Sequence, residues 1–198
     1  MPPTLVGLTG GIGAGKSEAL AAFERAGAAT LASDQVVHEL LRSGEVRSRL
    51  EERFGDEVAP GGEIDRRKVA EIVFDRPEEL EWLEAELHPR VGERIAAWRA
   101  ELPPEAKLAV IEVPLLFEAG LEGIFDAVVS VIAPDEQRER RAAERGLASL
   151  EGRSGRQLSQ EEKAARAAHV ISNDGTLADL EAKIADLADE LTGSGGST

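Results

Sequence analysis

The sequence predicts an α/β fold: a five-stranded, mainly parallel, doubly wound sheet that carries a helical substrate-binding subdomain and a lid. Three observations predict it. Short apolar segments alternate with helical patterns, a glycine-rich loop follows the first apolar segment, and a long stretch without strand signal interrupts the alternation. Such alternation favours parallel strands joined by helices. A chain of 198 residues is long enough for one domain of this type with an insertion.

Five short apolar segments are expected to form the strands. They cover residues 5–9, 28–31, 108–111, 127–132 and 169–172. Right-handed crossovers place the carboxyl ends of parallel strands at one edge of the sheet. We therefore expect this edge to collect the glycine-rich loop, Asn173 after the last strand, and Asp34 at the end of the strand next to the loop.

Residues 10–17 read Gly-Gly-Ile-Gly-Ala-Gly-Lys-Ser and spell a complete phosphate-binding loop. Glycines let backbone N–H groups converge on phosphate oxygens, and the helix that follows begins with its partial positive charge. Lys16 is expected to bridge the β- and γ-phosphates of ATP, and Ser17 to bind Mg²⁺. The pattern predicts a P-loop NTPase fold. The residues expected to cradle the nucleotide are Gly11, Ile12, Gly13, Ala14, Gly15, Lys16 and Ser17.

Composition limits the partners. The chain has 38 acidic and 23 basic side chains, a net charge of -15, which argues against general binding to nucleic acid or anionic membranes. It has no cysteine, and its three histidines lack metal-ligand spacing. No apolar stretch approaches about 20 residues, and the N-terminus lacks a signal-peptide pattern. We expect a cytoplasmic protein that is a monomer or a weak homo-oligomer.

Further patterns favour a small-molecule kinase over other P-loop proteins. The chain lacks the Asn-Lys-x-Asp and Asp-x-x-Gly strings of GTPases and the Leu-Ser-Gly-Gly signature of transporter ATPases. It also carries six arginines between residues 138 and 156, a local excess of positive charge. A solvated helix face with i,i+4 pairs is one interpretation. A lid that closes over ATP is the other, with Arg141 and Arg145 as its phosphate-binding cations.

The predicted organisation is a single kinase domain over residues 1–192, with a disordered tail at 193–198. Its parts are a core (1–40, 105–136 and 166–192), a helical acceptor-binding insertion (about 41–104) and a lid region (about 137–165). Simple bulk that covers the sheet is the alternative interpretation of the insertion. Helices are expected over residues 46–54 and 66–74 and along an apolar stripe from Leu80 to Trp98, where Pro89 should kink or break the helix.

Several motifs in this order resemble the dephospho-CoA kinase family over nearly the whole chain. They are residues 7–17, Ser33-Asp34 with His38, residues 82–84 leading to Leu87-His88-Pro89, residues 113–118 (Val-Pro-Leu-Leu-Phe-Glu), Gln157 with Glu162-Lys163 and Arg166, and residues 170–175. The resemblance implies ATP-dependent phosphorylation of the ribose 3′-hydroxyl of dephospho-CoA, which yields CoA and ADP. The alternatives are another P-loop kinase, acting on a nucleoside monophosphate or a sugar acid, and a nucleotide-dependent switch with little turnover.

The resemblance also implies site residues. Asp34 matches the catalytic aspartate, although an ordinary helix N-cap is the alternative role. Many members read Asp-Ala-Asp with a later Arg, whereas this chain has Ala32-Ser33-Asp34 and His38, which leaves open whether a fixed positive charge meets the substrate. Asn173 is expected at the adenine of ATP, or else is a turn residue. The other residues expected at the substrate are His88, Leu116, Phe117 and Glu118, with helix termination as the alternative role of His88.

Overall fold

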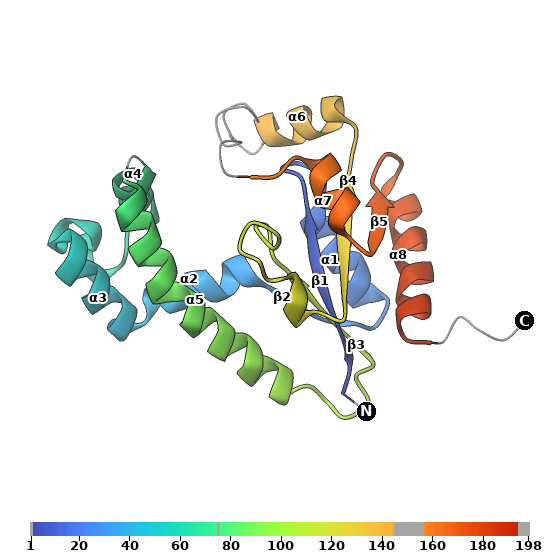
Figure 1. The fold of residues 1–198 in the computed structure, drawn as a ribbon, viewed down its shortest axis with the longest axis horizontal. Helices are drawn as coiled ribbons and strands as arrows, with labels where there is room; N and C mark the ends of the chain where they lie inside the picture. Colours follow the sequence, from blue (N-terminus) through green and yellow to red (C-terminus); the bar gives the residue numbers. More distant parts are fainter. Residues whose placement is uncertain (1, 75, 145–156, 194–198) are drawn as a thin grey trace, which may run out of the picture. The chain divides into compact units, whose positions relative to one another are not determined.

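The computed structural model describes residues 2–74, 76–144 and 157–193. Its sheet has five strands, all parallel, in the order β2-β3-β1-β4-β5 (Figure 1). The strands are β1 (Thr4–Gly10), β2 (Ala29–Ala32), β3 (Leu108–Glu112), β4 (Ala127–Ile132) and β5 (His169–Ser172). The predicted fold class and all five predicted strands are therefore confirmed.

The central strand is β1, with β3 on one side and β4 on the other. The chain leaves β1 in one direction to form β2 and β3, and later continues on the opposite side with β4 and β5. Strand order reverses at β1, and ligands of open α/β sheets bind at such a point, beyond the carboxyl ends of the strands. The phosphate loop follows this strand directly.

One expectation about this edge is wrong. We expected Asp34 to follow the strand next to the phosphate loop, but β3 lies between β1 and β2. The reason is that a crossover helix can join two parallel strands that are not neighbours in the sheet. Here α1 (Lys16–Arg25) joins β1 to β2, and β3 lies between these two strands.

The two faces of the sheet pack differently because strand side chains alternate. On one face Val6 and Leu8 belong to a buried apolar cluster with α1 and α8 (Leu177–Leu191), two helices that also pack on each other. On the other face Gly7 lies under Leu116 and Phe125. Three shorter elements complete this core unit: η3 (Glu122–Ile124), α6 (Asp135–Glu144) and α7 (Gln160–Arg166), which contacts β4 and β1.

The chain forms two compact units, a core unit (Met1–Ala32 and Leu102–Thr198) and a helical unit (Ser33–Glu101). The helical unit comprises α2 (Ser33–Arg42), α3 (Gly44–Phe54), η1 (Asp56–Val58), η2 (Pro60–Gly62), α4 (Arg66–Phe74) and α5 (Pro77–Ala100). Each α-helix of this unit buries apolar side chains, Leu40, Leu50 and Leu87 among them. Trp82 on α5 meets Phe54 edge to face, with 5.4 Å between ring centroids. The helices predicted over 46–54 and 66–74 are present.

Of the kink or break predicted at Pro89, the break is wrong, because α5 runs through Pro89 as one helix of 24 residues, and the kink stays a prediction. A proline removes a single backbone donor and crowds the preceding turn. Here α5 packs against α2 and α4, and this packing supports the continuous helix. Within the described ranges, neither α5 nor any other helix is long and apolar enough to cross a membrane.

Some sequence predictions fall outside the described residues. These are the central part of the predicted lid, residues 145–156, which includes Arg145, and residues 194–198 of the predicted tail.

Gly7 provides a test of the packing beneath the phosphate loop. A Cβ at this position would lie 2.5 Å from Leu116 Cδ1 and 2.9 Å from the Phe125 ring. Because both neighbours are buried, Gly7→Ala should lower the free energy of unfolding by about 1–3 kcal/mol in urea titrations. Gly92→Ala is the matched control, since no atom lies within 4 Å of its added methyl group and alanine favours a helix. Equal stabilities for Gly7→Ala and wild type would contradict this packing.

Candidate active site

The phosphate loop joins the end of β1 to the first turn of α1. Gly15 is the N-cap of α1 and adopts φ 97°, and no side chain caps the helix. A helix N-terminus presents backbone N–H groups without intrahelical partners, and its dipole favours negative charge. The loop therefore leads into an uncapped helix terminus that suits a phosphate group.

Side chains from later parts of the chain hold the carbonyl groups of this loop. Asn173, directly after β5, donates from Nδ2 to the carbonyl oxygen of Ala14 at 2.9 Å. From α6, Arg138 Nε donates to the Ile12 carbonyl at 3.0 Å, and Arg141 Nη1 donates to the Gly13 carbonyl at 3.3 Å. The N–H and C=O of a peptide unit point in opposite directions, so fixing the carbonyl groups also orients the N–H groups.

Two loop glycines are required by this close packing. At Gly15 a Cβ would lie 2.2 Å from Asn173 Nδ2, and at Gly13 it would lie 2.5 Å from the carbonyl oxygen of Arg138. Both also have positive φ values, 97° and 75°, in the region that favours glycine. These glycines thus allow α6 and the residue after β5 to approach the loop backbone.

Lys16 and Ser17 are the first two residues of α1, and the roles predicted for them at ATP and Mg²⁺ stay predictions. The Lys16 ammonium group donates to the carbonyl oxygens of Gly10 at 3.2 Å and Gly11 at 3.0 Å, so its stem folds back over the loop. The Ser17 side chain lies at the exposed start of the helix. A cation and a hydroxyl group therefore flank the helix N-terminus.

A cavity of about 330 Å³ lies beside the loop within the core unit. Its lining comprises Gly15, Glu18, Arg141, Glu144, Asn173, Gly175, Leu177 and Leu180. Asn173 is buried, whereas the Leu177 side chain remains 52% exposed and offers an apolar surface. The cavity combines apolar, amide and charged groups, as small-molecule sites commonly do.

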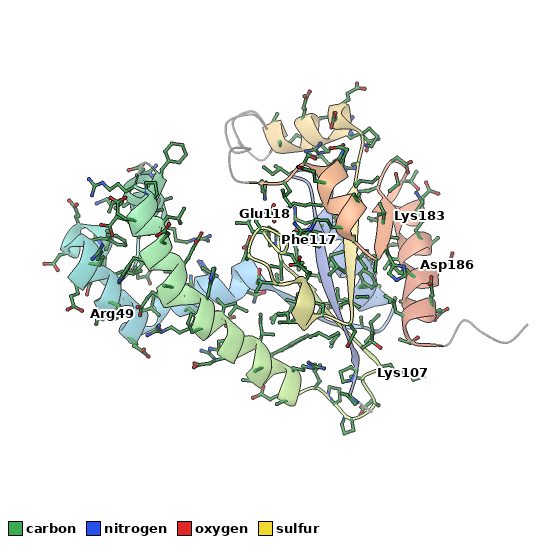
Figure 2. All side chains as sticks on the ribbon, in the orientation of Figure 1. Arg49, Lys107, Phe117, Glu118, Lys183 and Asp186 are labelled. Carbon is green, nitrogen blue, oxygen red and sulfur yellow. The ribbon has the colours of Figure 1, made fainter. Side chains whose placement is uncertain are left out.

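The loop after β5 that carries Asn173 is fixed from α8 (Figure 2). Lys183 Nζ donates to the Ser172 carbonyl at 2.7 Å and to Asp174 Oδ1 at 3.0 Å, and this hydrogen bond lowers the pKa of the Asp174 carboxyl group. Asp179 accepts from the backbone N–H of Thr176 at 2.8 Å, which lowers the pKa of Asp179. Both carboxylates therefore stabilise this loop in their charged form at neutral pH.

The Leu-Leu-Phe-Glu string after β3 is mostly packed inward. Leu116 is buried against β1, and Phe117 is buried with the Arg166 guanidinium 4.5 Å from its ring centroid. Leu115 is the exposed apolar side chain of the string. The side chains of Leu116 and Phe117 therefore contribute to the core. The roles predicted for both residues at the substrate stay predictions.

Glu118, which Figure 2 labels, forms a buried ion pair that the sequence did not reveal. Its Oε1 atom lies 2.9 Å from Lys163 Nζ and accepts the Leu158 backbone N–H at 2.9 Å. Lys163, on α7, is fully buried and also donates to the Pro114 carbonyl at 2.6 Å. These bonds tie α7 and the segment before it to the loop after β3. The predicted contact of Glu118 with substrate stays a prediction.

The remaining predicted residues lie in the helical unit. Asp34 is the second residue of α2 and is exposed, and His38 lies one turn later and is half-buried. His88 is exposed within α5, so it does not terminate a helix as the alternative interpretation required. The contact predicted between His88 and the acceptor stays a prediction.

Sequence reasoning missed three features of the core site. It gave Asn173 a ligand role but no role in holding the loop, and it assigned nothing to Lys163. It also overlooked Gln160, whose side-chain amide bonds both the N–H and the carbonyl of Ala133, each at 3.1 Å. The signal that could have identified Lys163 is its place in the Glu162-Lys163 motif. No local pattern reveals the partners of the other two.

Comparison with known proteins decides the family. The family model of dephospho-CoA kinase matches residues 4–179, which include the phosphate loop, Asp34 and Asn173. The chain belongs to the dephospho-CoA kinase family. The resemblance inferred from the motifs is thereby confirmed.

Relatives and solved structures agree with membership of the dephospho-CoA kinase family. A dephospho-CoA kinase of Deinococcus radiodurans is 40% identical over 186 residues, covering 92% of this chain and 89% of the relative. A crystal structure from Thermus thermophilus is 38% identical, with a TM-score of 0.81 and coverage of 96% and 99%. The dephospho-CoA kinase from Campylobacter jejuni is 27% identical, with a TM-score of 0.65 and coverage of 96% and 98%.

The pair of Lys163 and Glu118 gives a stability test. Lys163→Met leaves a carboxylate that is only 12% exposed without its cation, so we expect a loss of about 3 kcal/mol in the free energy of unfolding. Adding Glu118→Gln should recover much of that loss, because the neutral amide does not need a counter-ion. Lys183→Met, which breaks the exposed pair with Asp174, serves as control and should cost much less. A double variant no more stable than Lys163→Met would contradict the account.

Proposed function

We propose that this chain transfers the γ-phosphoryl group of ATP to the ribose 3′-hydroxyl of dephospho-CoA, which gives CoA and ADP. The observation that carries the proposal is the family match over residues 4–179. The phosphate loop supports it, because its carbonyl groups are tied to later elements while an uncapped helix terminus faces the phosphate position. The proposed pathway is CoA biosynthesis.

The core unit is proposed to bind ATP. The adenine ring fits the cavity beside the loop, where Leu177 provides an apolar surface and Asn173 a polar one. The triphosphate then runs along the loop to the start of α1, where Lys16 meets the β- and γ-phosphates. Arg141 lines the same cavity and is the proposed lid-side cation. Arg145, outside the described residues, remains a prediction.

The residues at the start of α1 also fit Mg²⁺. The described residues include no group of three carboxylate, histidine or cysteine side chains able to hold a metal ion, so the protein offers chiefly the Ser17 hydroxyl group. This suits Mg²⁺, which retains several water molecules and binds substrate phosphates in addition to one or two protein groups. When bound, the ion would neutralise charge on the β- and γ-phosphate oxygens.

Asp34 is proposed to receive the proton of the attacking 3′-hydroxyl group. As the oxygen of that group bonds to the γ-phosphorus, the bond between the γ-phosphorus and the oxygen bridging it to the β-phosphorus breaks, and ADP leaves. Negative charge moves toward the bridging oxygen and the β-phosphate, where Lys16 and Arg141 stabilise it. No hydrogen bond or ion pair within the described residues of the helical unit occupies the Asp34 carboxylate.

Acceptor identity is tested by coupled measurement of ADP release. With dephospho-CoA as acceptor, kcat/KM should exceed that with AMP, CMP or gluconate by at least about 100-fold, since a site built for one acceptor leaves polar groups unpaired with the others. Mass spectrometry should find the added phosphate on the ribose. Activity on a nucleoside monophosphate or gluconate without activity on dephospho-CoA would refute the proposal.

The role of Asp34 is tested by Asp34→Asn, which keeps the shape but removes the base. We expect kcat to fall by about 10²–10⁴-fold, the usual contribution of a general base, while calorimetry shows unchanged ATP affinity. Asp56→Asn is a matched control, because Asp56 is another exposed aspartate of the helical unit. If Asp34→Asn keeps the wild-type kcat, Asp34 is not the base and turnover does not depend on this carboxylate.

A further inference from the structure

Two side chains of α2 share one face of the helical unit. Asp34 and His38 are four residues apart on this helix, so they lie one above the other, about 6 Å apart along the axis. Asp34 is exposed and His38 is half-buried. A ligand that meets the Asp34 carboxylate therefore comes within reach of the His38 imidazole.

A third side chain reaches this face from another helix. Arg66, the first residue of α4, places its Nη1 atom 3.4 Å from His38 Nδ1. A guanidinium group only donates hydrogen bonds, so this contact requires Nδ1 to accept and assigns the imidazole proton to Nε2. The contact then leaves further N–H donors of Arg66 and the Nε2–H of His38 for a ligand.

The charge of Arg66 is not neutralised within the described residues. Five other arginines of the helical unit form ion pairs with glutamates, namely Arg47, Arg49, Arg53, Arg67 and Arg90. Arg66 forms none, and its side chain contacts a histidine nitrogen instead. The adjacent Asp65 is occupied otherwise, because its Oδ1 accepts the backbone N–H groups of Arg67 at 3.0 Å and Lys68 at 3.3 Å.

A free cation held in place is unusual in a chain with a net charge of -15. Four further arginines of the helical unit have no carboxylate partner either, and no side-chain hydrogen bond within the described residues fixes them: Arg42, Arg76, Arg94 and Arg99. Arg66 thus combines an unneutralised charge with a defined position beside His38, one helical turn from the candidate base. Such a cation can accept an anionic ligand group as its counter-charge.

We infer that Arg66, positioned by His38, binds the 5′-diphosphate of dephospho-CoA while Asp34 receives its 3′-hydroxyl group. This inference rests on the proposed function. The 5′-diphosphate and the 3′-hydroxyl are attached to the same ribose ring. Their spacing is therefore of the order of the separation between Asp34 and His38 along α2, about 6 Å. A guanidinium fork matches two phosphate oxygens, and the Nε2–H of His38 adds one donor. Many family members carry an arginine where this chain has His38. In this chain Arg66 supplies the fixed positive charge.

The test compares two adjacent arginines by steady-state kinetics. Arg66→Ala should raise the KM for dephospho-CoA at least tenfold and leave the KM for ATP within twofold of wild type. Arg66→Lys should fall between, because it keeps the charge but loses the fork. Arg67→Ala is the matched control: its side chain is 84% exposed and its contact to Glu71 is 3.9 Å long, so its KM values should stay within twofold.

Variants of His38 test the positioning role separately. His38→Asn keeps an acceptor near the place of Nδ1, whereas His38→Leu removes it. We expect the KM for dephospho-CoA to rise more in His38→Leu than in His38→Asn, with thermal melting within a few degrees of wild type for both. Equal KM increases in the two variants would overturn the positioning role.

The outcomes separate this inference from the proposed function. If the wild-type protein does not phosphorylate dephospho-CoA, the proposed function fails whatever Arg66 does. If the wild type is active and Arg66→Ala keeps its KM for dephospho-CoA, the inference fails and the proposed function stands. A fall in kcat with both KM values unchanged would also overturn it, because that pattern indicates a structural role for Arg66 and no contact with the diphosphate.

Discussion

The carbonyl groups of the phosphate loop are held by side chains from elements far along the chain, and the geometry of the nucleotide site depends on this restraint. Asn173 follows the last strand, and Arg138 and Arg141 belong to α6. A glycine-rich segment loses more conformational entropy on ordering than any other, so a loop of this composition needs external restraints to keep one shape. With the carbonyl groups engaged on one side, the N–H groups remain available for phosphate on the other.

The same restraint links the loop to the rest of the core unit. Asn173 is placed by the parallel pairing of β5 with β4 and by Lys183 of α8, which bonds the carbonyl of the preceding residue. On the other face of the sheet, buried Lys163 joins α7 to the loops after β3. An ion pair buried this deeply is weak evidence for stability, but it is a demanding geometric constraint because either partner alone is costly. We interpret the contacts of Lys183 and of Lys163 as interactions that fix the loops at the carboxyl edge of the sheet.

Much of this architecture could be predicted from local pattern. The phosphate loop, the five strands and the helix over residues 66–74 each depend on periodicity or turn chemistry within a few residues, and all are confirmed. The position of β3 between β1 and β2 depends on how crossovers fill the sheet, which no local segment encodes. Pro89 likewise looks like a helix end until the packing of α5 is known. The contacts of Asn173 with Ala14 and of Arg66 with His38 join residues distant in sequence, so composition and spacing gave no sign of them.

The central claim, that side-chain donors preset the phosphate loop, is tested most directly by calorimetric binding of inorganic diphosphate to wild type and Asn173→Ala. Diphosphate has no adenine, so a contact between Asn173 and the base cannot affect the result. Loss of one buried hydrogen bond to the loop, about 0.5–1.5 kcal/mol, should weaken binding by up to about tenfold. Equal affinities of the two proteins for diphosphate would show that the loop adopts its phosphate-binding shape without this restraint, and would contradict the account.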